Sequence, residues 1–437
     1  MNNKTFLFGG LIWACAFGLF AQETGSKLTL NQLLDSAVQR NYLLQAYDKN
    51  NSIKLAEIEM LKTNYLPKIN ASASFSFWKF LLPNKEKLLG NTLTDMYTDI
   101  TAYQTLYDWG ENKAKKSLVN AEMKVNDEVR RQIRNTIIWG VADTYFENLN
   151  ADTEIQVHKN ALEQLKEHLK YAENLYSIGK VSGVDVLKVK VQIALEEKNL
   201  QITINSTQGL WIKLRRLSFL NENAEMNIEN KSEALYNKQR ETLFSAMSLY
   251  ENALQNHPVL LAGKNKIAIE SKQKEIYNLA SRPELYSYGI GSWEHGYIPF
   301  GNNFNYNIGV GIRYTIPYWG GSSFKSKVKQ SDYRIEQLKD ENHQSFLELK
   351  KEIDMALNVI DDIKSEISNN QKIINLSNET LKNALVKYQA GQGPILDVLD
   401  AQSILTNTTI AYNKSTINYL QALVKLHYLT GNDTYPF

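Results

Sequence analysis

Apolar residues recur every three to four positions along most of the chain, and two segments of strand-like sequence interrupt this helical pattern. The spacing predicts helices at about 29–64, 111–178, 184–220, 245–280, 322–389 and 395–430. The two longest segments contain no proline, and each would extend about 100 Å as a helix. The first helix has a capping-box pattern, Thr29-x-x-Gln32, and Leu28 is placed to contact Leu33.

Two shorter helices, placed end to end, match one long helix in length. Each half of the chain can therefore form two rods of equal length that pack as a coiled coil. A free antiparallel bundle is the alternative that periodicity alone leaves open.

The segment 305–318 alternates between an apolar set and a polar set of positions. The apolar positions are Tyr306, Ile308, Val310, Ile312, Tyr314, Ile316 and Tyr318. An apolar face with tyrosines at its ends is typical of a strand whose other face lines the polar lumen of a membrane barrel. We therefore expect the first five of these side chains to face lipid and Arg313 to face the lumen. A half-buried soluble strand alternates in the same way, and Arg313 has an extracellular-rim or structural role as its alternative.

The alternation of apolar and polar positions is weaker in the other strand segments. Residues 71–77 alternate Ala and Phe with Ser, 286–290 places Tyr286, Tyr288 and Ile290 at alternate positions, and 97–107 is less regular. The chain then has four strands in two hairpins, at about 69–107 and 284–318. Because about eight strands is the minimum for a membrane barrel, and an open edge is not tolerated in lipid, a barrel must be shared among protomers.

The two halves of the chain are similar to each other. YSIGKVSGVDVL at 176–187 aligns without a gap with YQAGQGPILDVL at 388–399, an offset of 212, and Asn41 aligns with His257 at an offset of 216. This duplication predicts a first repeat at 28–220, a polar linker at 221–243 and a second repeat at 244–431, each repeat being one structural unit.

The first 21 residues are typical of a signal peptide, with Lys4 followed by an uncharged apolar run that ends near Ala21. An uncleaved anchor is one alternative, and acylation of Cys15, in a loose lipobox, is another. No second apolar stretch of this length follows. An exported chain of this kind would have to use strands to enter a membrane.

Composition disfavours several other classes. The 437 residues carry 49 Lys and Arg against 47 Asp and Glu, so no basic field would recruit nucleic acid. There is one cysteine, and the six histidines stand apart in the sequence, so neither a metal nor another cofactor is expected. We find no Ser/His/Asp constellation and no phosphate-binding loop, and an enzyme is the least favoured class.

These features together resemble the outer membrane efflux protein family, the TolC-like channels, over essentially all of 28–431. The most specific parts are the corners Leu106-Tyr107-Asp108-Trp109-Gly110 and Ile316-Pro317-Tyr318-Trp319-Gly320, and the segment Tyr388-x-x-Gly391 followed by Asp397-Val398-Leu399-Asp400. The resemblance implies an α+β membrane protein, a homotrimer with a shared twelve-stranded barrel in the outer membrane and an α-helical tunnel into the periplasm. It also implies an exit duct of a tripartite efflux or type I secretion system, with a periplasmic adaptor and an inner-membrane transporter as partners.

The resemblance further assigns roles to the turns at 178–185 and 390–397, where the tunnel would be narrowest. Asp397 and Asp400 match a constricting acidic ring, and Asp185 with Tyr388 match a hydrogen-bonded pair that holds the hairpins closed. Gly393 stands where the family has an arginine, and a pair of Lys188 with Asp400 is a candidate replacement. The adaptor-binding tips would include Gly179, Val184 and Gly391.

Local helix structure could also account for these residues without a gate. Asp397 follows Pro394 by three residues and Ser182-x-x-Asp185 has capping-box spacing, so both carboxylates could stabilise helix N-termini. Tyr388 could be a packing aromatic, and the two glycines could be ordinary helix ends. For the whole protein the alternative is a non-channel periplasmic coiled-coil scaffold. The sequence does not reveal the transported substrate.

Overall fold

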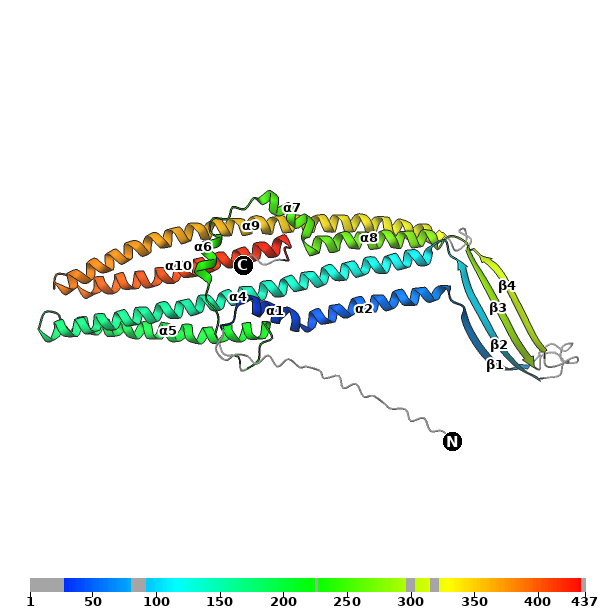
Figure 1. Ribbon diagram of the computed structural model, residues 1–437, viewed down its shortest axis with the longest axis horizontal. Helices are drawn as coiled ribbons and strands as arrows, with labels where there is room; N and C mark the ends of the chain where they lie inside the picture. Colours follow the sequence, from blue (N-terminus) through cyan, green and yellow to red (C-terminus); the bar gives the residue numbers. More distant parts are fainter. Residues whose placement is uncertain are drawn as a thin grey trace, which may run out of the picture.

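The computed structural model describes residues 27–79, 92–222, 224, 227–295, 303–314 and 322–433. The predicted signal peptide with Cys15 and the second predicted corner, 316–320, lie outside these ranges. The described chain is a long rod of helices with a small sheet at one end and two helical turns at the other (Figure 1).

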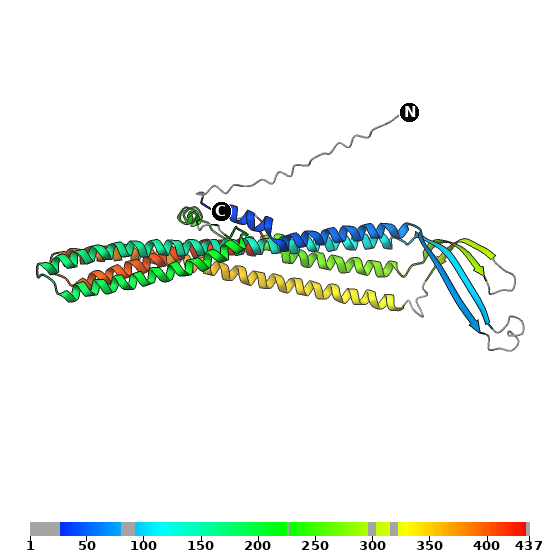
Figure 2. The ribbon, with the colours of Figure 1, turned by 90° about the horizontal axis from the view of Figure 1, so that it is seen from below.

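Two very long helices run along the rod. α4 (Glu111–Ser177) has 67 residues and α9 (Ser322–Gln389) has 68, so each is about 100 Å long. The shorter helices are α2 (Tyr42–Lys62), α5 (Gly183–Leu217), α8 (Pro258–Leu279) and α10 (Ile395–Thr430). α2 and α5 pack along α4, and α8 and α10 pack along α9, in each case one toward the sheet and one toward the turns (Figure 1, Figure 2). Shorter helices therefore lie in line along each long helix, as their lengths predicted.

The helices predicted at 29–64 and 245–280 are each broken in two, and the expectation of continuous helices there is wrong. Between α1 (Leu30–Arg40) and α2, Asn41 adopts an extended backbone, and its side chain accepts hydrogen bonds from the Leu43 and Leu44 N–H groups at 2.9 and 3.2 Å. Between α7 (Ala246–Asn256) and α8, His257 is extended because it precedes Pro258. The first helix begins with the predicted capping box at Thr29 and Gln32.

The sheet contains β1 (Lys68–Lys79), β2 (Thr92–Tyr107), β3 (Glu284–His295) and β4 (Asn303–Arg313). A 3₁₀ turn, η1 (Thr63–Tyr65), connects α2 to β1. The strands are antiparallel in the order β1-β2-β3-β4, so each half of the chain gives one hairpin and the hairpins meet through β2 and β3. β1 and β4 are left as the two edges of the sheet.

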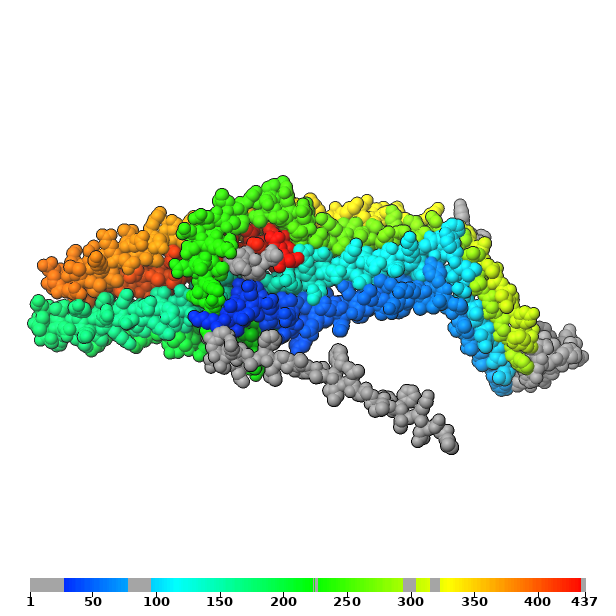
Figure 3. Space-filling model, in the orientation of Figure 1, coloured from blue at the N-terminus to red at the C-terminus, as the bar shows by residue number. Residues whose placement is uncertain are grey.

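The segment between the halves is an ordered part of the fold and not only a polar connection. It contains α6 (Ser232–Gln239), and Ile228 forms a parallel bridge with Leu28. The Tyr419 hydroxyl donates to the Gln239 carbonyl oxygen at 2.9 Å, and the Tyr145 hydroxyl donates to the Glu229 carbonyl oxygen at 2.6 Å. Figure 3 shows this segment and α7, in green, crossing the helices near the middle of the rod.

Buried apolar side chains form two clusters. The larger one lies around the crossing segment and includes Leu33, Phe146, Leu214, Ile353, Leu420 and Leu423. The smaller one lies near the turns and includes Leu165, Val189, Tyr388, Ile395 and Val398. Each cluster joins α4 or α5 of the first half to α9 or α10 of the second, so the core holds the two halves together at both places.

Candidate functional site: the apolar sheet and the helix tips

One face of the sheet carries large apolar side chains that nothing in the described chain covers. On β4, Ile308 is 81% exposed and Ile312 is 71% exposed, and Tyr306 and Val310 are exposed on the same face. Phe75 and Phe77 on β1 continue this face at the opposite edge, as the register of the strands requires. β4 ends at Arg313, so Tyr314 follows the strand, and residues 315–318 lie outside the described part.

The opposite face is polar, but it also carries a group of tyrosines. Tyr286 pairs with Gly311 and Tyr288 pairs with Gly309 in the antiparallel register of β3 with β4. Directly paired residues lie on one face of a sheet, so Tyr286, Tyr288 and Ile290 share the face of Arg313 and not the face of Ile308. The alternation at 286–290 therefore marks the polar face of the sheet and not the apolar face.

Arg313 lies on this polar face at the end of the sheet nearest the helices. Its guanidinium is 5.1 Å from the Tyr103 ring centroid and 5.0 Å from that of Tyr286, and it is 3.6 Å from a Glu284 carboxylate oxygen. Glu284 also accepts hydrogen bonds from the hydroxyls of Tyr103 and Thr105, at 3.2 and 2.8 Å. Because Glu284 begins β3 directly after the helices, Arg313 lies at the helix end of the sheet and not at its loop end.

The corner between β2 and α4 is built on Asp108. Its carboxylate accepts hydrogen bonds from the Tyr65 hydroxyl at 2.8 Å and from the N–H groups of Gly110 and Asn112 at 3.0 and 2.8 Å. Trp109 and Gly110 have positive φ values of 57° and 90°, which turn the chain from strand into helix. Burial and the adjacent Asp108 raise the pKa of Tyr65 to about 12, so this hydroxyl stays a donor.

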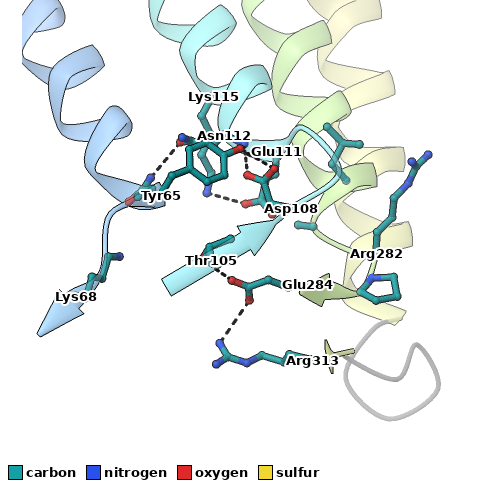
Figure 4. A pocket seen from close by; sticks show the side chains of 14 residues that line it. Tyr65, Lys68, Thr105, Asp108, Glu111, Asn112, Lys115, Arg282, Glu284 and Arg313 are labelled. Carbon is teal, nitrogen blue, oxygen red and sulfur yellow. Dashed lines mark hydrogen bonds and ion pairs between the residues drawn. The ribbon is translucent and has the colours of Figure 1, made fainter. Parts of the chain in front are cut away.

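A cavity of about 280 Å³ opens at this corner, between the helix ends and the sheet. Figure 4 shows the side chains that line it, with Asp108, Tyr65 and Asn112 on one side and the chain of contacts Thr105, Glu284 and Arg313 on the other. Lys68, Lys115 and Arg282 add positive charge to its wall.

The two helix turns at the other end of the rod have the same backbone. In the first, the Lys180 N–H donates to the Leu175 carbonyl oxygen and the Gly179 N–H donates to that of Tyr176, both at 2.9 Å. In the second, Gln392 and Gly391 donate to Lys387 and Tyr388 in the same way, at 2.9 and 3.0 Å. Gly179 and Gly391 have φ values of 74° and 72°, as this type of helix end requires.

Asp185 and Tyr388 lie near each other, but they do not form the expected hydrogen bond within the described chain. Tyr388 is only 2% exposed, and its buried hydroxyl has no partner among the described residues. Burial, and then the charge of Asp185, raise the pKa of Tyr388. The Asp185 carboxylate instead lies 3.7 Å from the Lys188 amine on the next turn of α5. The expected pair of Lys188 with Asp400 is therefore also absent from the described chain.

Asp397 and Asp400 are both exposed on α10, with Asp397 in its first turn. Asp185 likewise lies in the first turn of α5, but the N-cap residue Ser182 makes no side-chain capping hydrogen bond, so the capping-box alternative is wrong. A first-turn carboxylate is still stabilised by the helix dipole. Beside these charges, Val184 at the start of α5 is 58% exposed.

The described residues hold no cluster of three or more His, Cys, Asp or Glu side chains placed to bind a metal. Within the same ranges, every helix is too short or too polar to cross a bilayer.

The sequence analysis missed Tyr103 at the polar face, and it placed Gly309 and Gly311 on that face without their role opposite the tyrosines. The signal that identifies them is the Gly-x-Gly spacing of β4 opposite the Tyr-x-Tyr spacing of β3, which becomes meaningful once the register is known.

An exposed apolar sheet face at the end of paired 100 Å helices is typical of one class of protein, the outer membrane channels with a helical tunnel. The chain belongs to the outer membrane efflux protein family, whose sequence model matches residues 33–218 and 249–432. It is therefore an outer membrane protein, and its helices extend into the periplasm.

Two curated relatives are similar over most of the chain. The pyoverdine export outer membrane protein OpmQ of Pseudomonas aeruginosa is 21% identical over 91% of this chain and 85% of its own length. The outer membrane protein TolC of Escherichia coli is 23% identical over 72% of this chain and 65% of its own length.

Solved structures share the fold. CusC has a TM-score of 0.76 at 17% identity, over 92% of each chain. VceC of Vibrio cholerae has a TM-score of 0.72 at 16% identity, over 92% of this chain and 96% of its own.

Proposed function

We propose that three copies of this chain form a channel through the outer membrane, which serves as the exit duct of a tripartite efflux or secretion system. In this proposal each chain contributes four strands to one closed twelve-stranded barrel, and the helices form a tunnel through the periplasm. A periplasmic adaptor and an inner-membrane transporter deliver substrate to the tunnel.

The open sheet is the observation that carries this proposal. Its apolar face, with Ile308 81% exposed, is suited to lipid, but β1 and β4 are edge strands with no neighbouring strand on their outer sides among the described residues. Lipid does not tolerate such edges, since an unpaired N–H or C=O group there costs several kcal/mol. An even number of antiparallel strands per chain lets β4 of one protomer pair with β1 of the next in the same antiparallel sense.

The helix tips would form the gate of this tunnel. Three chains would place six carboxylates, from Asp397 and Asp400, around one axis, and a narrow acidic ring favours cations over anions. The buried Tyr388 hydroxyl lacks a partner within the described chain, so a small movement of the hairpins toward Asp185 would stabilise a closed state. Lys188 would set the position of Asp185 through their 3.7 Å contact.

The adaptor would dock at the same tips. Val184, Leu187, Val191 and Leu195 form an exposed apolar stripe along the start of α5, at spacings that place them on one helix face. Such a stripe is suited to an added helix. Gly179 and Gly391 would supply the tight turns that the docking helices approach.

The test is the mass and the conductance of the purified full-length protein. In detergent, light scattering should give a mass of three chains, and the same sample should form cation-selective channels in planar lipid bilayers. A protein that purifies as a monomer without detergent and gives no channels would favour a periplasmic scaffold and overturn the proposal.

A further inference from the structure

The polar face of the sheet carries an aromatic surface that a simple aqueous pore does not need. Tyr103, Tyr286 and Tyr288 lie together there, and we call these three residues with Arg313 the tyrosine cluster. The rings of Tyr103 and Tyr286 are stacked, with centroids 5.0 Å apart, and those of Tyr286 and Tyr288 are 6.1 Å apart. All three rings are partly exposed, and apart from Ile290 the side chains named on this face are polar or glycine.

Glycines on the neighbouring strand allow the rings to lie along the sheet. A Cβ atom at Gly309 would be 2.8 Å from the Tyr288 ring, and one at Gly311 would be 2.7 Å from the Tyr286 ring. Any larger residue would push the rings away from the sheet. Tyr286 and Tyr288 therefore each cover a glycine with part of the ring, and both side chains remain partly exposed on the polar face.

Arg313 adds a positive charge with unused hydrogen-bonding capacity to these rings. Its side chain is 58% exposed, and its ion pair with Glu284 is a single contact of 3.6 Å. A guanidinium has five N–H donors in a plane, so most of them remain available to a second anion. The Glu284 carboxylate is shared between Arg313 and two hydroxyl groups, because it also accepts hydrogen bonds from Tyr103 and Thr105.

The cavity next to the cluster has a small excess of positive charge. Arg313 belongs to both, and Glu284 joins them through its contacts with Tyr103 and Arg313, as Figure 4 shows for the cavity side. Its wall has four cationic and three acidic side chains, and among the described residues neither Lys68 nor Arg282 has a carboxylate partner. Glu111 is paired with Lys115 at 2.6 Å, and the whole wall has a net formal charge of +1.

We propose that the tyrosine cluster, with the adjacent cavity, is a binding site for planar aromatic anions such as aromatic carboxylates. The ring of the ligand would stack on Tyr286 and Tyr288, and its anionic group would bind the Arg313 guanidinium. Stacking supplies preference for a flat ring, and a charge-assisted hydrogen bond supplies preference for an anion. That this site faces the channel lumen rests on the proposed function.

The test uses the full-length protein and two carboxylates of equal charge, 2-naphthoate and cyclohexanecarboxylate. In planar bilayers, 2-naphthoate should reduce the channel current at lower concentration than cyclohexanecarboxylate. Replacing Tyr286 and Tyr288 together by leucine, or Arg313→Gln alone, should raise the half-blocking concentration of 2-naphthoate about tenfold. Trp293→Leu is the matched control, because Trp293 is an exposed aromatic of β3 on the opposite face.

Equal block by the two carboxylates, or unchanged block in both variants, would overturn the inference and leave the tyrosines with only a structural role over the glycines. Titration calorimetry of 2-naphthoate with the detergent-purified protein measures the same preference without a channel. If the protein forms no channel but binds 2-naphthoate with the predicted variant pattern, the proposed function fails and the binding site stands. If it conducts without selective binding, only the binding site fails.

Discussion

Replacing Ile308 by arginine should destabilise the membrane-inserted protein strongly. Ile308 is the central residue of the 11-residue strand β4, and its side chain is 81% exposed on the apolar face. At about 3.4 Å per residue and a tilt near 40°, eleven residues cover roughly 28 Å of bilayer thickness, close to the apolar band of about 25 Å in membrane barrels. Residue 308 would then lie near the midplane, where an exposed arginine costs about 2 to 4 kcal/mol.

Asn307→Arg is the matched control, since it adds the same charge one residue away on the polar face. It should change the free energy of unfolding by less than about 1 kcal/mol. The assay is denaturant unfolding of both variants in lipid vesicles, followed by tryptophan fluorescence. Equal destabilisation by the two variants, or a neutral Ile308→Arg, would refute the assignment of this face to lipid.

Three further predictions concern residues of the helices and of the turns between them. Burial, and then the charge of Arg131, lower the pKa of His257 to about 4, below its unfolded value of about 6.5, so the native state binds fewer protons. The free energy of unfolding should therefore fall as the pH drops from 6.5 to 4, by up to roughly 3 kcal/mol, and His257→Gln should flatten this dependence in thermal unfolding. Gly391→Ala should lower stability by about 1 to 2 kcal/mol because φ is 72° there, measured by denaturant unfolding. Asp397→Asn combined with Asp400→Asn should lower the cation-to-anion permeability ratio in planar bilayers.

For each of these three predictions, one outcome would contradict it. A pH dependence that His257→Gln leaves unchanged would assign the acid sensitivity to other groups. Gly140→Ala is the control for Gly391→Ala, because Gly140 lies inside α4 with open space around its Cβ position and should gain up to about 1 kcal/mol. Equal losses at both glycines would contradict the backbone argument. Unchanged selectivity in the double Asp variant would leave Asp397 with only its first-turn role.

The long helices were predictable because their apolar spacing runs without proline. The predicted segments 111–178 and 322–389 correspond to α4 at Glu111–Ser177 and α9 at Ser322–Gln389. The breaks at Asn41 and His257 were not predicted, since the apolar spacing continues across both positions. Asn41 stops the first helix through its own side-chain hydrogen bonds, and Pro258 stops the second through backbone sterics.

The face of the sheet on which the β3 tyrosines lie could not be predicted from the sequence of β3 alone. Alternation at 286–290 indicates that Tyr286, Tyr288 and Ile290 share a face, but the identity of that face depends on which residues of β4 they oppose. The pairing of Tyr288 with Gly309 sets it on the side of Arg313. Alternation within β4 was sufficient by itself, because its second face contains only polar residues and glycine.

The helix tips were predictable in their turns but not in their contacts. The aligned glycines gave both turns correctly, since positive φ at a helix end is a local property. The partners of Asp185 and Tyr388 depend on how the hairpins pack. The burial of the Tyr388 hydroxyl, which has no partner within the described ranges, has no signature in the sequence.

The central claim is that edges β1 and β4 of neighbouring protomers pair to close one barrel, and disulfide trapping tests it most directly. In a Cys15→Ser background, Ala71→Cys on β1 would be combined in turn with cysteine at Tyr306, Ile308 or Val310 on the same face of β4. Within one chain these strands are about 14 Å apart across the sheet, too far for a disulfide. The account predicts that one combination gives covalent dimers and trimers in intact outer membranes on oxidation. Only uncrosslinked chains in all three combinations would contradict it.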